Sequence, residues 1–232
     1  KTDDGKTQAA VEYRGRRPRR IHGLSLSTAL TGAAPVAEAR LRDDLMDLVI
    51  KPVFACEEIG LDAATRVFIN PGGTITGGGP AVHSGLTGRK TGVDTYGEYA
   101  RQSGSALSGK DPTRIDRIGA YIARYAAKNV VAAALADECE VQLSYSIGLA
   151  RPVSLQIETF GTGRIDDSVI TRRIEAAIDF RLAGILRRFG LRDLPARAAD
   201  GFYGRLAAYG HVGRADLDLP WEATDASAAL VA

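Results

Sequence analysis

The sequence has few cysteines, few aromatic residues and no long apolar run. It contains 2 cysteines, 1 methionine and 1 tryptophan in 232 residues, and aromatic residues make up 6%. Cys56 and Cys139 lie far apart among apolar neighbours, so we expect buried free thiols in a reducing compartment rather than a disulfide. No apolar run reaches the roughly 20 residues that would span a bilayer, and no signal peptide opens the chain. We therefore expect a cytoplasmic protein with no membrane partner.

An excess of charge of one sign is also lacking. The 30 Lys and Arg residues nearly balance the 28 Asp and Glu residues, for a formal net charge of +2, which does not favour a nucleic-acid partner. Five arginines lie between Arg14 and Arg20, but without interleaved aromatic residues we interpret them as the solvated tip of a hairpin. The chain opens at Lys1 without an initiator Met, so we expect a fragment of a longer protein.

The first third of the chain predicts strands and one helix. Alternating apolar and polar residues predict two antiparallel strands over residues 7–14 and 20–28. Helical spacing of apolar residues predicts a helix over 36–50 that ends at Pro52, followed by a short strand over 66–70. The apolar stripe of that helix comprises Leu41, Leu45, Leu48 and Val49.

The rest of the chain predicts a long loop and then alternating helices and strands. Residues 71–109 are glycine-rich and read as a mostly irregular stretch, and such long loops are usually functional or disordered. Asp111 and Pro112 suit the N-cap and first position of a long helix. The buried face of that helix is predicted to be Ile118, Tyr121, Ile122, Tyr125 and Ala126. The remaining predicted elements are strands over 141–149 and 153–160 and helical segments over about 167–190 and 202–209. This order favours an α+β fold with helices packed on mixed sheets.

The stretch Gly77–Arg117 carries the chemistry. Small residues over Gly104–Gly109 let backbone N–H groups approach an anion, and the helix predicted from Asp111 would point its N-terminus at the same place. Asp116, in the second turn of that helix, is a hard oxygen ligand suited to Mg²⁺. Four nearby cations are Arg89, Lys90, Lys110 and Arg114. The spacing is not that of a Walker A loop. Two interpretations stay open here, a phosphate site or a structural glycine-rich loop with ordinary surface charges.

Several segments resemble the signature segments of the methionine adenosyltransferase family. The most specific are Gly85-Leu86-Thr87-Gly88-Arg89-Lys90, Val93-Asp94-Thr95-Tyr96-Gly97 and Ser108-Gly109-Lys110-Asp111-Pro112. Further similar segments are Asp4-Gly5-Lys6-Thr7-Gln8, Phe68-Ile69-Asn70-Pro71, Ala126-Ala127-Lys128-Asn129, Ser144-Tyr145-Ser146-Ile147-Gly148, Ala208-Tyr209-Gly210-His211 and Pro220-Trp221-Glu222. The ordered matches extend over nearly the whole chain.

The resemblance implies a fold, a reaction and an assembly. The family builds each subunit from three similar α/β domains, so residues 1–77 would be the remainder of a central domain and residues 78–232 the C-terminal domain. Its members transfer the adenosyl group of ATP to the sulfur of L-methionine, and the displaced triphosphate is hydrolysed to pyrophosphate and phosphate. Mg²⁺ and K⁺ assist. The family works as a homodimer or a dimer of dimers, with active sites shared between subunits.

The resemblance also assigns roles to residues. Those expected to bind ATP or substrate are Asp4, Gly5, Lys6, His83, Arg89, Lys90, Ala106, Lys110 and Arg114. Lys110 and Arg89 are the expected catalytic residues because they would hold the leaving triphosphate, and Asp116 is the expected Mg²⁺ ligand. Arg114 stands where the family usually has Lys.

The chain departs from the family at four places. His83 replaces an Asp that contacts methionine and nucleotide, Thr74-Ile75 replaces an Arg-Phe pair, Leu107 replaces an aromatic residue, and residues 102–105 differ from the His/Gly-rich form. The family's N-terminal catalytic segment is not in the sequence, so we expect the chain to be inactive alone. The alternative is a noncatalytic or degenerate paralogue that binds nucleotide or pairs with a complete partner.

Overall fold

The computed structural model describes residues 5–30, 36–82, 84, 91–101, 106–198 and 201–231. The chain divides into two compact units, Lys1–Gly85 and Leu86–Ala232. The domain limits expected from the sequence, 1–77 and 78–232, stay a prediction. Among the described helices, none combines the length and the apolar character needed to cross a bilayer.

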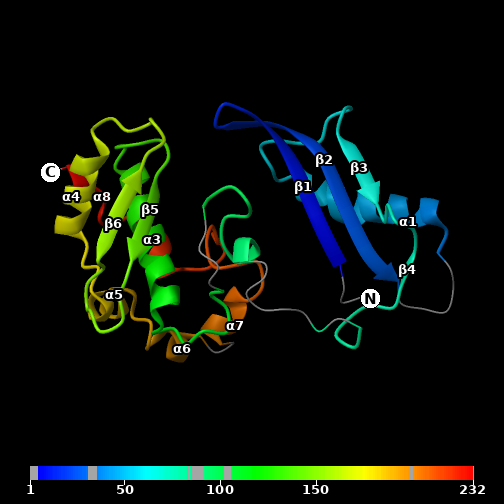
Figure 1. The fold of residues 1–232 in the computed structure, drawn as a ribbon. Coiled ribbons are helices and arrows are strands. Elements are labelled where there is room, and N and C mark those ends of the chain that lie inside the picture. Colours follow the sequence, from blue (N-terminus) through cyan, green and yellow to red (C-terminus); the bar gives the residue numbers. More distant parts are fainter. Residues whose placement is uncertain are drawn as a thin grey trace. The chain divides into compact units, whose positions relative to one another are not determined.

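The first unit is built on a mixed four-stranded sheet (Figure 1). Strands β1 (Gly5–Arg14) and β2 (Arg17–Leu30) form the long antiparallel hairpin that the alternating pattern predicts. Strands β3 (Arg66–Ile69) and β4 (Ile75–Thr76) pair with β2 in parallel. The strand predicted over 66–70 is therefore confirmed.

A β-bulge in the hairpin sets which side chains face the core. The register passes from Ala10 opposite Gly23 to Val11 opposite Ile21, so His22 is an extra residue on β2. The extra residue shifts the alternation by one position. Ile21 and Leu24 are both buried as a result, although three positions separate them.

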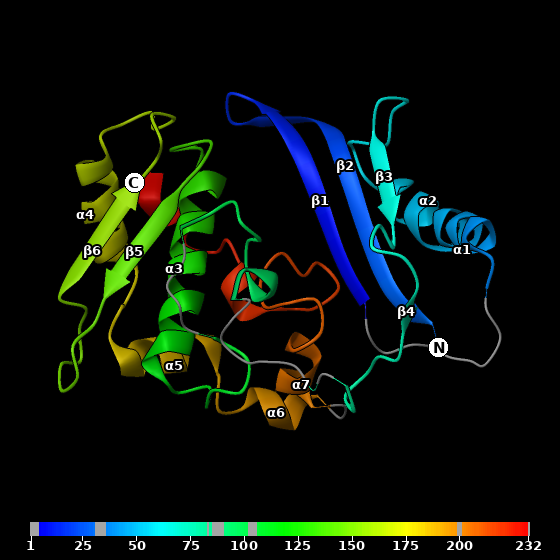
Figure 2. The same cartoon turned by 45° about the vertical axis from the view of Figure 1, so that its right-hand side comes forward.

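The helical segment of this unit differs from the prediction. It consists of α1 (Glu38–Leu45), the π-helical η1 (Met46–Ile50) and α2 (Lys51–Phe54), and Figure 2 shows α1 and α2 along one side of the sheet. Pro52 does not end the helix, because it lies in the first turn of α2, where its missing N–H removes no needed hydrogen bond. The wider turn of η1 rotates the following side chains. Leu48 is therefore 75% exposed, while Ile50 packs into the core.

The second unit is a two-stranded antiparallel sheet with helices packed on one face. Strands β5 (Glu140–Ser144) and β6 (Ser154–Glu158) alternate strictly in register. Val141 and Leu143 lie opposite Ile157 and Leu155, and these four side chains pack against the core. Polar residues occupy the other positions, as expected for a sheet with one solvated face. Both predicted strands form, but each is shorter than expected.

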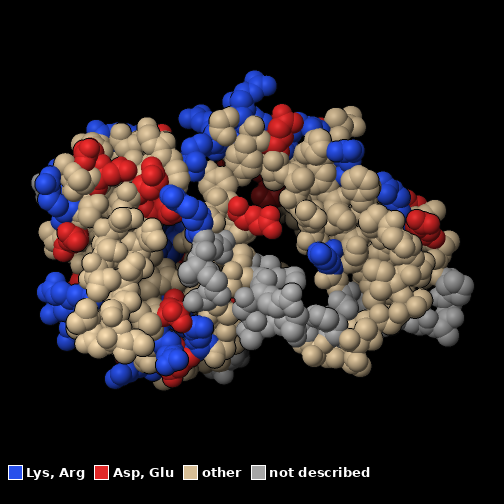
Figure 3. All heavy atoms as spheres, in the orientation of Figure 1, with Lys and Arg blue, Asp and Glu red and all other residues tan. Residues whose placement is uncertain are grey.

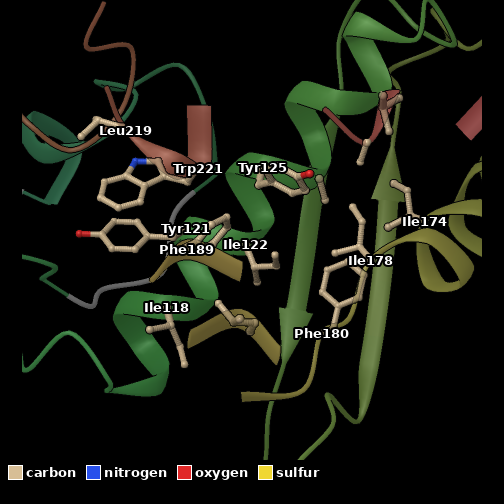
Figure 4. Packing of buried hydrophobic residues seen from close by; sticks show 14 of the residues in the cluster. Ile118, Tyr121, Ile122, Tyr125, Ile174, Ile178, Phe180, Phe189, Leu219 and Trp221 are labelled. Atoms are coloured by element: carbon tan, nitrogen blue, oxygen red, sulfur yellow. The ribbon is translucent and has the colours of Figure 1, made fainter. Parts of the chain in front are cut away.

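The helices of this unit carry most of its core. They are α3 (Ile115–Ala132), α4 (Asp167–Ala177), α5 (Leu182–Phe189), α6 (Leu194–Arg197), α7 (Phe202–Leu206) and α8 (Ser227–Val231), with short 3₁₀ turns η2 (Thr91–Asp94) and η3 (Pro220–Glu222). The face of α3 that the sequence predicts is buried, as Figure 4 shows for Ile118, Tyr121, Ile122 and Tyr125. The helical stretch predicted over 167–190 is interrupted, because the chain is extended at Ile178 before α5 begins. Mixed and antiparallel sheets with packed helices confirm the predicted α+β fold.

The long helix α3 begins three residues later than predicted. The Asp111 carboxylate accepts a hydrogen bond from the backbone N–H of Thr113 at 2.8 Å, and the Arg114 N–H donates to the Asp111 carbonyl at 3.0 Å. These bonds close a turn ahead of the helix, so Arg114 and not Asp111 is the N-cap residue. Asp116 consequently lies in the first turn of α3, not the second.

The expected burial of the two thiols is confirmed for neither cysteine in full. Cys56 and Cys139 are free, but Cys56 is exposed rather than buried. Cys139 is partly buried, and burial raises the pKa of its thiol to about 12.

On the face drawn in Figure 3, acidic and basic side chains lie interspersed on both units, in keeping with the small net charge.

Candidate functional site

The structure describes six of the ten residues expected at the site. Asp4, His83, Arg89 and Lys90 lie outside the described residues, so their predicted roles stay predictions. Gly5 and Lys6 begin β1 in the first unit, and both are exposed. The remaining four are Ala106, Lys110, Arg114 and Asp116, all in the second unit.

These four residues lie on one short loop and the start of α3. Lys110 donates its backbone N–H to the Leu107 carbonyl at 3.4 Å, which folds residues 107–110 into a turn. Gly109, inside that turn, has a φ of 82°, a value that suits glycine. Open space surrounds the position that a Cβ of Gly109 would occupy. The loop therefore presents backbone without side chains at this point, as the sequence predicts for an anion site.

Lys110 and Asp116 form the charged centre of the site. The Lys110 Nζ lies 3.6 Å from an Asp116 carboxylate oxygen, and the two side chains are 29% and 46% exposed. Asp116 in the first helical turn also interacts favourably with the helix dipole. Arg114 is exposed next to them. An ion pair this open is worth little stability, so both groups can exchange partners with a ligand.

An open pocket of about 420 Å³ adjoins this loop. The loop side of the pocket is Ser108, Gly109, Lys110, Asp111 and Pro112. The rest of the lining is Arg117 of α3, Tyr203 and Gly204 of α7, and Ala207. The lining thus carries two cations, Lys110 and Arg117, and two glycines that allow close approach.

The described residues contain no group of three or more His, Cys, Asp or Glu side chains placed to hold a metal. The acidic groups at this loop are the Asp116 carboxylate, 3.6 Å from Lys110 Nζ, and the Asp111 carboxylate in the pocket lining. This suits Mg²⁺, which commonly binds through one or two carboxylates and completes its shell with water and substrate phosphates. The role of Asp116 as a Mg²⁺ ligand stays a prediction.

Arg117 braces the loop from behind, and sequence reasoning missed it. Its guanidinium is 3% exposed and donates from Nη1 to the Lys110 carbonyl at 2.6 Å and from Nε to the Tyr121 hydroxyl at 2.9 Å. It also lies 4.6 Å from the centre of the Tyr203 ring. A buried charge is costly unless it is hydrogen-bonded, so the guanidinium keeps these partners. Its bond to the Lys110 carbonyl therefore holds the Lys110 backbone in place. The available signal was an arginine one helical turn before Tyr121, on the apolar face of α3.

His211 is the second missed residue. Its ring is fully buried, with Nδ1 at 2.8 Å from the Tyr121 hydroxyl and Nε2 at 2.8 Å from the Ser108 hydroxyl. Burial lowers the pKa of His211 to about 4, and the charges of Arg117 and Arg214 add to the effect. A neutral histidine therefore connects α3 to the pocket loop. The sequence showed His211 in a family-like segment but gave no sign of its partners.

Aromatic stacking fixes this arrangement. The rings of Tyr121 and Trp221 lie parallel with centroids 3.7 Å apart, as Figure 4 shows. The Trp221 indole N–H donates to the His211 carbonyl at 2.7 Å. Both ends of the His211 residue, side chain and backbone, are thus held by the core of the second unit.

The departures from the family pattern fall at different depths. Ile75, in β4, is 40% exposed, so an aromatic platform is replaced there by an accessible aliphatic side chain. Leu107 is 4% exposed and belongs to the core beside α3. Residues 102–105 lie outside the described residues, as does His83.

Comparison with known proteins gives consistent matches along the chain. The family model for the central domain of S-adenosylmethionine synthetase matches residues 1–75, and the model for its C-terminal domain matches residues 77–223. An S-adenosylmethionine synthase from Synechococcus sp. (strain JA-3-3Ab) is 53% identical over 234 residues, which cover 98% of this chain and 56% of the relative. One from Gloeobacter violaceus is 52% identical over 98% of this chain and 57% of the relative.

A comparison with solved structures points to the same family. An S-adenosylmethionine synthetase from Campylobacter jejuni superposes with a TM-score of 0.85 at 34% identity, over 98% of this chain and 59% of that one. The chain thus spans a little more than half the length of the relatives it matches. Because the C-terminal-domain model alone matches well over half of the residues, this chain belongs to the S-adenosylmethionine synthetase family.

Proposed function

We propose that this chain forms the central and C-terminal part of an enzyme that makes S-adenosylmethionine from ATP and L-methionine. The observation that carries the proposal is the Lys110–Asp116 pair beside a glycine-containing loop whose backbone is braced by a buried arginine. In support of the proposal, the Lys110 amine and the Asp116 carboxylate are both partly exposed beside the loop that lines the pocket. Relatives at about half identity are named for this activity.

In this reaction the methionine sulfur attacks C5′ of ATP. The new S–C5′ bond forms as the C5′–O bond breaks, and the triphosphate leaves with the bonding electrons. Lys110 would neutralise the charge that moves onto the triphosphate, with Arg114 and Arg89 in support. Such electrostatic stabilisation is often the largest catalytic contribution. Water then cleaves the triphosphate to pyrophosphate and phosphate.

The proposal includes two cations, an assembly and a compartment. Asp116 would hold Mg²⁺, which would supply positive charge to the polyphosphate oxygens, and K⁺ enters through the family resemblance alone. Asp4, Gly5, Lys6, Lys90 and Ala106 would contact nucleotide, and His83 would affect the choice of substrate. A homodimer or dimer of dimers would complete the shared active sites. The free thiols suit the reducing cytoplasm.

A chimera tests this function. The part of the Synechococcus relative that this chain does not match would be joined ahead of Lys1, and product formation from ATP and methionine would be followed by chromatography. We expect synthesis of S-adenosylmethionine that is lost on Lys110→Ala. The matched control is Lys51→Ala, because Lys51 makes a similar exposed Lys–Asp pair in the first unit, with Nζ 2.6 Å from Asp47.

The contrary result is equally clear. A folded chimera that binds ATP but forms no S-adenosylmethionine would favour the noncatalytic paralogue. A chimera that accepts another thioether in preference to methionine would show that the replacement at His83 has changed the substrate.

A further inference from the structure

A chain of four hydrogen-bonding groups runs from the core to the pocket, and its direction can be read from the chemistry of its members. It comprises Arg117, Tyr121, His211 and Ser108. An arginine can only donate, so the Tyr121 oxygen accepts from Arg117 Nε at 2.9 Å. The Tyr121 hydroxyl hydrogen is then free to point at His211 Nδ1, 2.8 Å away.

Among the described residues, no group other than His211 Nδ1 accepts the Tyr121 hydroxyl hydrogen, which favours donation to this nitrogen. A neutral histidine carries one ring proton, and if Nδ1 accepts from Tyr121, the proton resides on Nε2. In that tautomer Nε2 donates to the Ser108 oxygen, 2.8 Å away. Burial and the nearby Arg117 and Arg214 charges keep the ring neutral by lowering the pKa of His211 to about 4.

The last group in the chain is left with a hydrogen to give. Ser108 accepts from His211, and among the described residues no acceptor takes the hydrogen of the Ser108 hydroxyl. Ser108 lines the pocket next to Gly109 and Lys110. A hydroxyl donor beside a lysine and a glycine backbone suits an anionic oxygen of a phosphate group.

We propose that His211 is a positioning residue that turns the Ser108 hydroxyl hydrogen toward a polyphosphate oxygen in the pocket. This inference rests on the proposed function for the identity of the anion. It assigns to Ser108 a direct contact with the ligand, and to Tyr121 and His211 the role of setting its direction. With the proton on Nδ1 instead, the same pair would be a serine activated by a histidine base, so the location of the ring proton decides between two chemistries.

Nuclear magnetic resonance on the 232-residue chain measures that proton directly. Histidine-labelled protein would be examined by long-range ¹H–¹⁵N correlation, and the three histidines would be assigned with His22→Gln and His83→Gln variants. We expect His211 to be neutral with a protonated Nε2 at pH about 7. A neutral ring protonated at Nδ1, or a charged ring, overturns the inference whatever the enzyme activity is.

Binding of inorganic tripolyphosphate to the chimera described above tests the ligand contact. By calorimetry, Ser108→Ala should weaken binding about tenfold, as expected for loss of a hydrogen bond to a charged group, whereas Ser108→Thr should keep most of the affinity. Tyr121→Phe should weaken binding about threefold or more and leave a mixture of His211 tautomers. Tyr145→Phe is the matched control, because it removes a hydroxyl that donates to the Phe180 carbonyl at 2.9 Å, remote from the pocket lining.

The outcomes separate the two proposals. An active chimera whose Ser108→Ala variant binds tripolyphosphate normally would overturn this inference and leave the proposed function standing. A chimera that binds no tripolyphosphate would overturn the anion site itself and, with it, the ligand assigned to Ser108.

Discussion

Protonation of His211 should destabilise the second unit as the pH falls below neutrality. The pKa of this histidine is lowered from 6.5 to about 4, chiefly because the folded protein buries the ring and secondarily because Arg117 and Arg214 oppose a further positive charge. The unfolded chain therefore takes up a proton before the folded chain does. The corresponding stability is fully present above pH about 6.5 and is lost progressively as the pH falls toward 4.

The size of the effect follows from the shift. A difference of about 2.5 pKa units corresponds to at most about 3 kcal/mol, of which about 2 kcal/mol is lost between pH 7.5 and pH 5. Other groups titrate over the same range, so the quantity to compare is the pH dependence of a variant that lacks the imidazole. His211→Gln should be less stable overall but should lose about 2 kcal/mol less than the unaltered chain over this interval.

The chain contains its own reporter for this measurement. Trp221 is the one tryptophan in the sequence, is fully buried and stacks on Tyr121, so its fluorescence follows unfolding of the second unit in urea. His22→Gln is the control, because it removes an exposed histidine of β2 in the first unit, whereas Trp221 reports on the second unit. Equal losses in the unaltered chain and in His211→Gln would refute a depressed pKa at this buried ring.

Four further outcomes follow from the structure. In the chimera, Lys110→Ala should lower kcat by a factor of about 10² or more with little change in methionine binding, and Lys110→Arg should restore activity in part. Triphosphate hydrolysis would be assayed separately. A near-normal kcat in both assays would show that Lys110 has no part in the mechanism. Asp116→Asn should sharply lower activity at limiting Mg²⁺, and unchanged activity there would exclude it as a ligand. Glu222→Gln should lower the free energy of unfolding in urea by about 2 kcal/mol, because the 13% exposed Glu222 carboxylate pairs with Arg124 and Lys128 of α3. A change below about 0.5 kcal/mol would show that these ion pairs are dispensable for stability. The 232-residue chain alone should self-associate in light scattering, because both faces of β1 are exposed with Val11 and Tyr13 among its residues, whereas a stable monomer would contradict this.

The sequence predicts elements whose periodicity is uninterrupted. The buried face of α3 follows from apolar residues at helical spacing, and the β1–β2 hairpin follows from alternation. The prediction is wrong where backbone geometry changes the period. A π turn after Met46 exposes Leu48, and the turn closed by Asp111 delays the start of α3.

Some residues of the candidate site could likewise be predicted from the sequence, and others could not. Lys110 and Asp116 are local in sequence, so the pattern alone places them near one another, as the structure does. Arg117 and His211 were missed because their importance lies in contacts across the fold. A buried histidine is indistinguishable in sequence from an exposed one, and its partners Ser108 and Tyr121 are 103 and 90 residues away.

Those sequence separations have a consequence for how the site comes into being. The pocket loop is synthesised about a hundred residues before His211 and Trp221, which help to hold it. Contacts of such long range form late in folding, because the intervening chain must first be closed into a loop. A product terminated before His211 would contain Ser108, Lys110 and Asp116 and still lack their arrangement. The loop is therefore translated first, but it becomes competent to bind a ligand only after the rest of the second unit has folded. Binding competence is a property of the finished unit rather than of the loop.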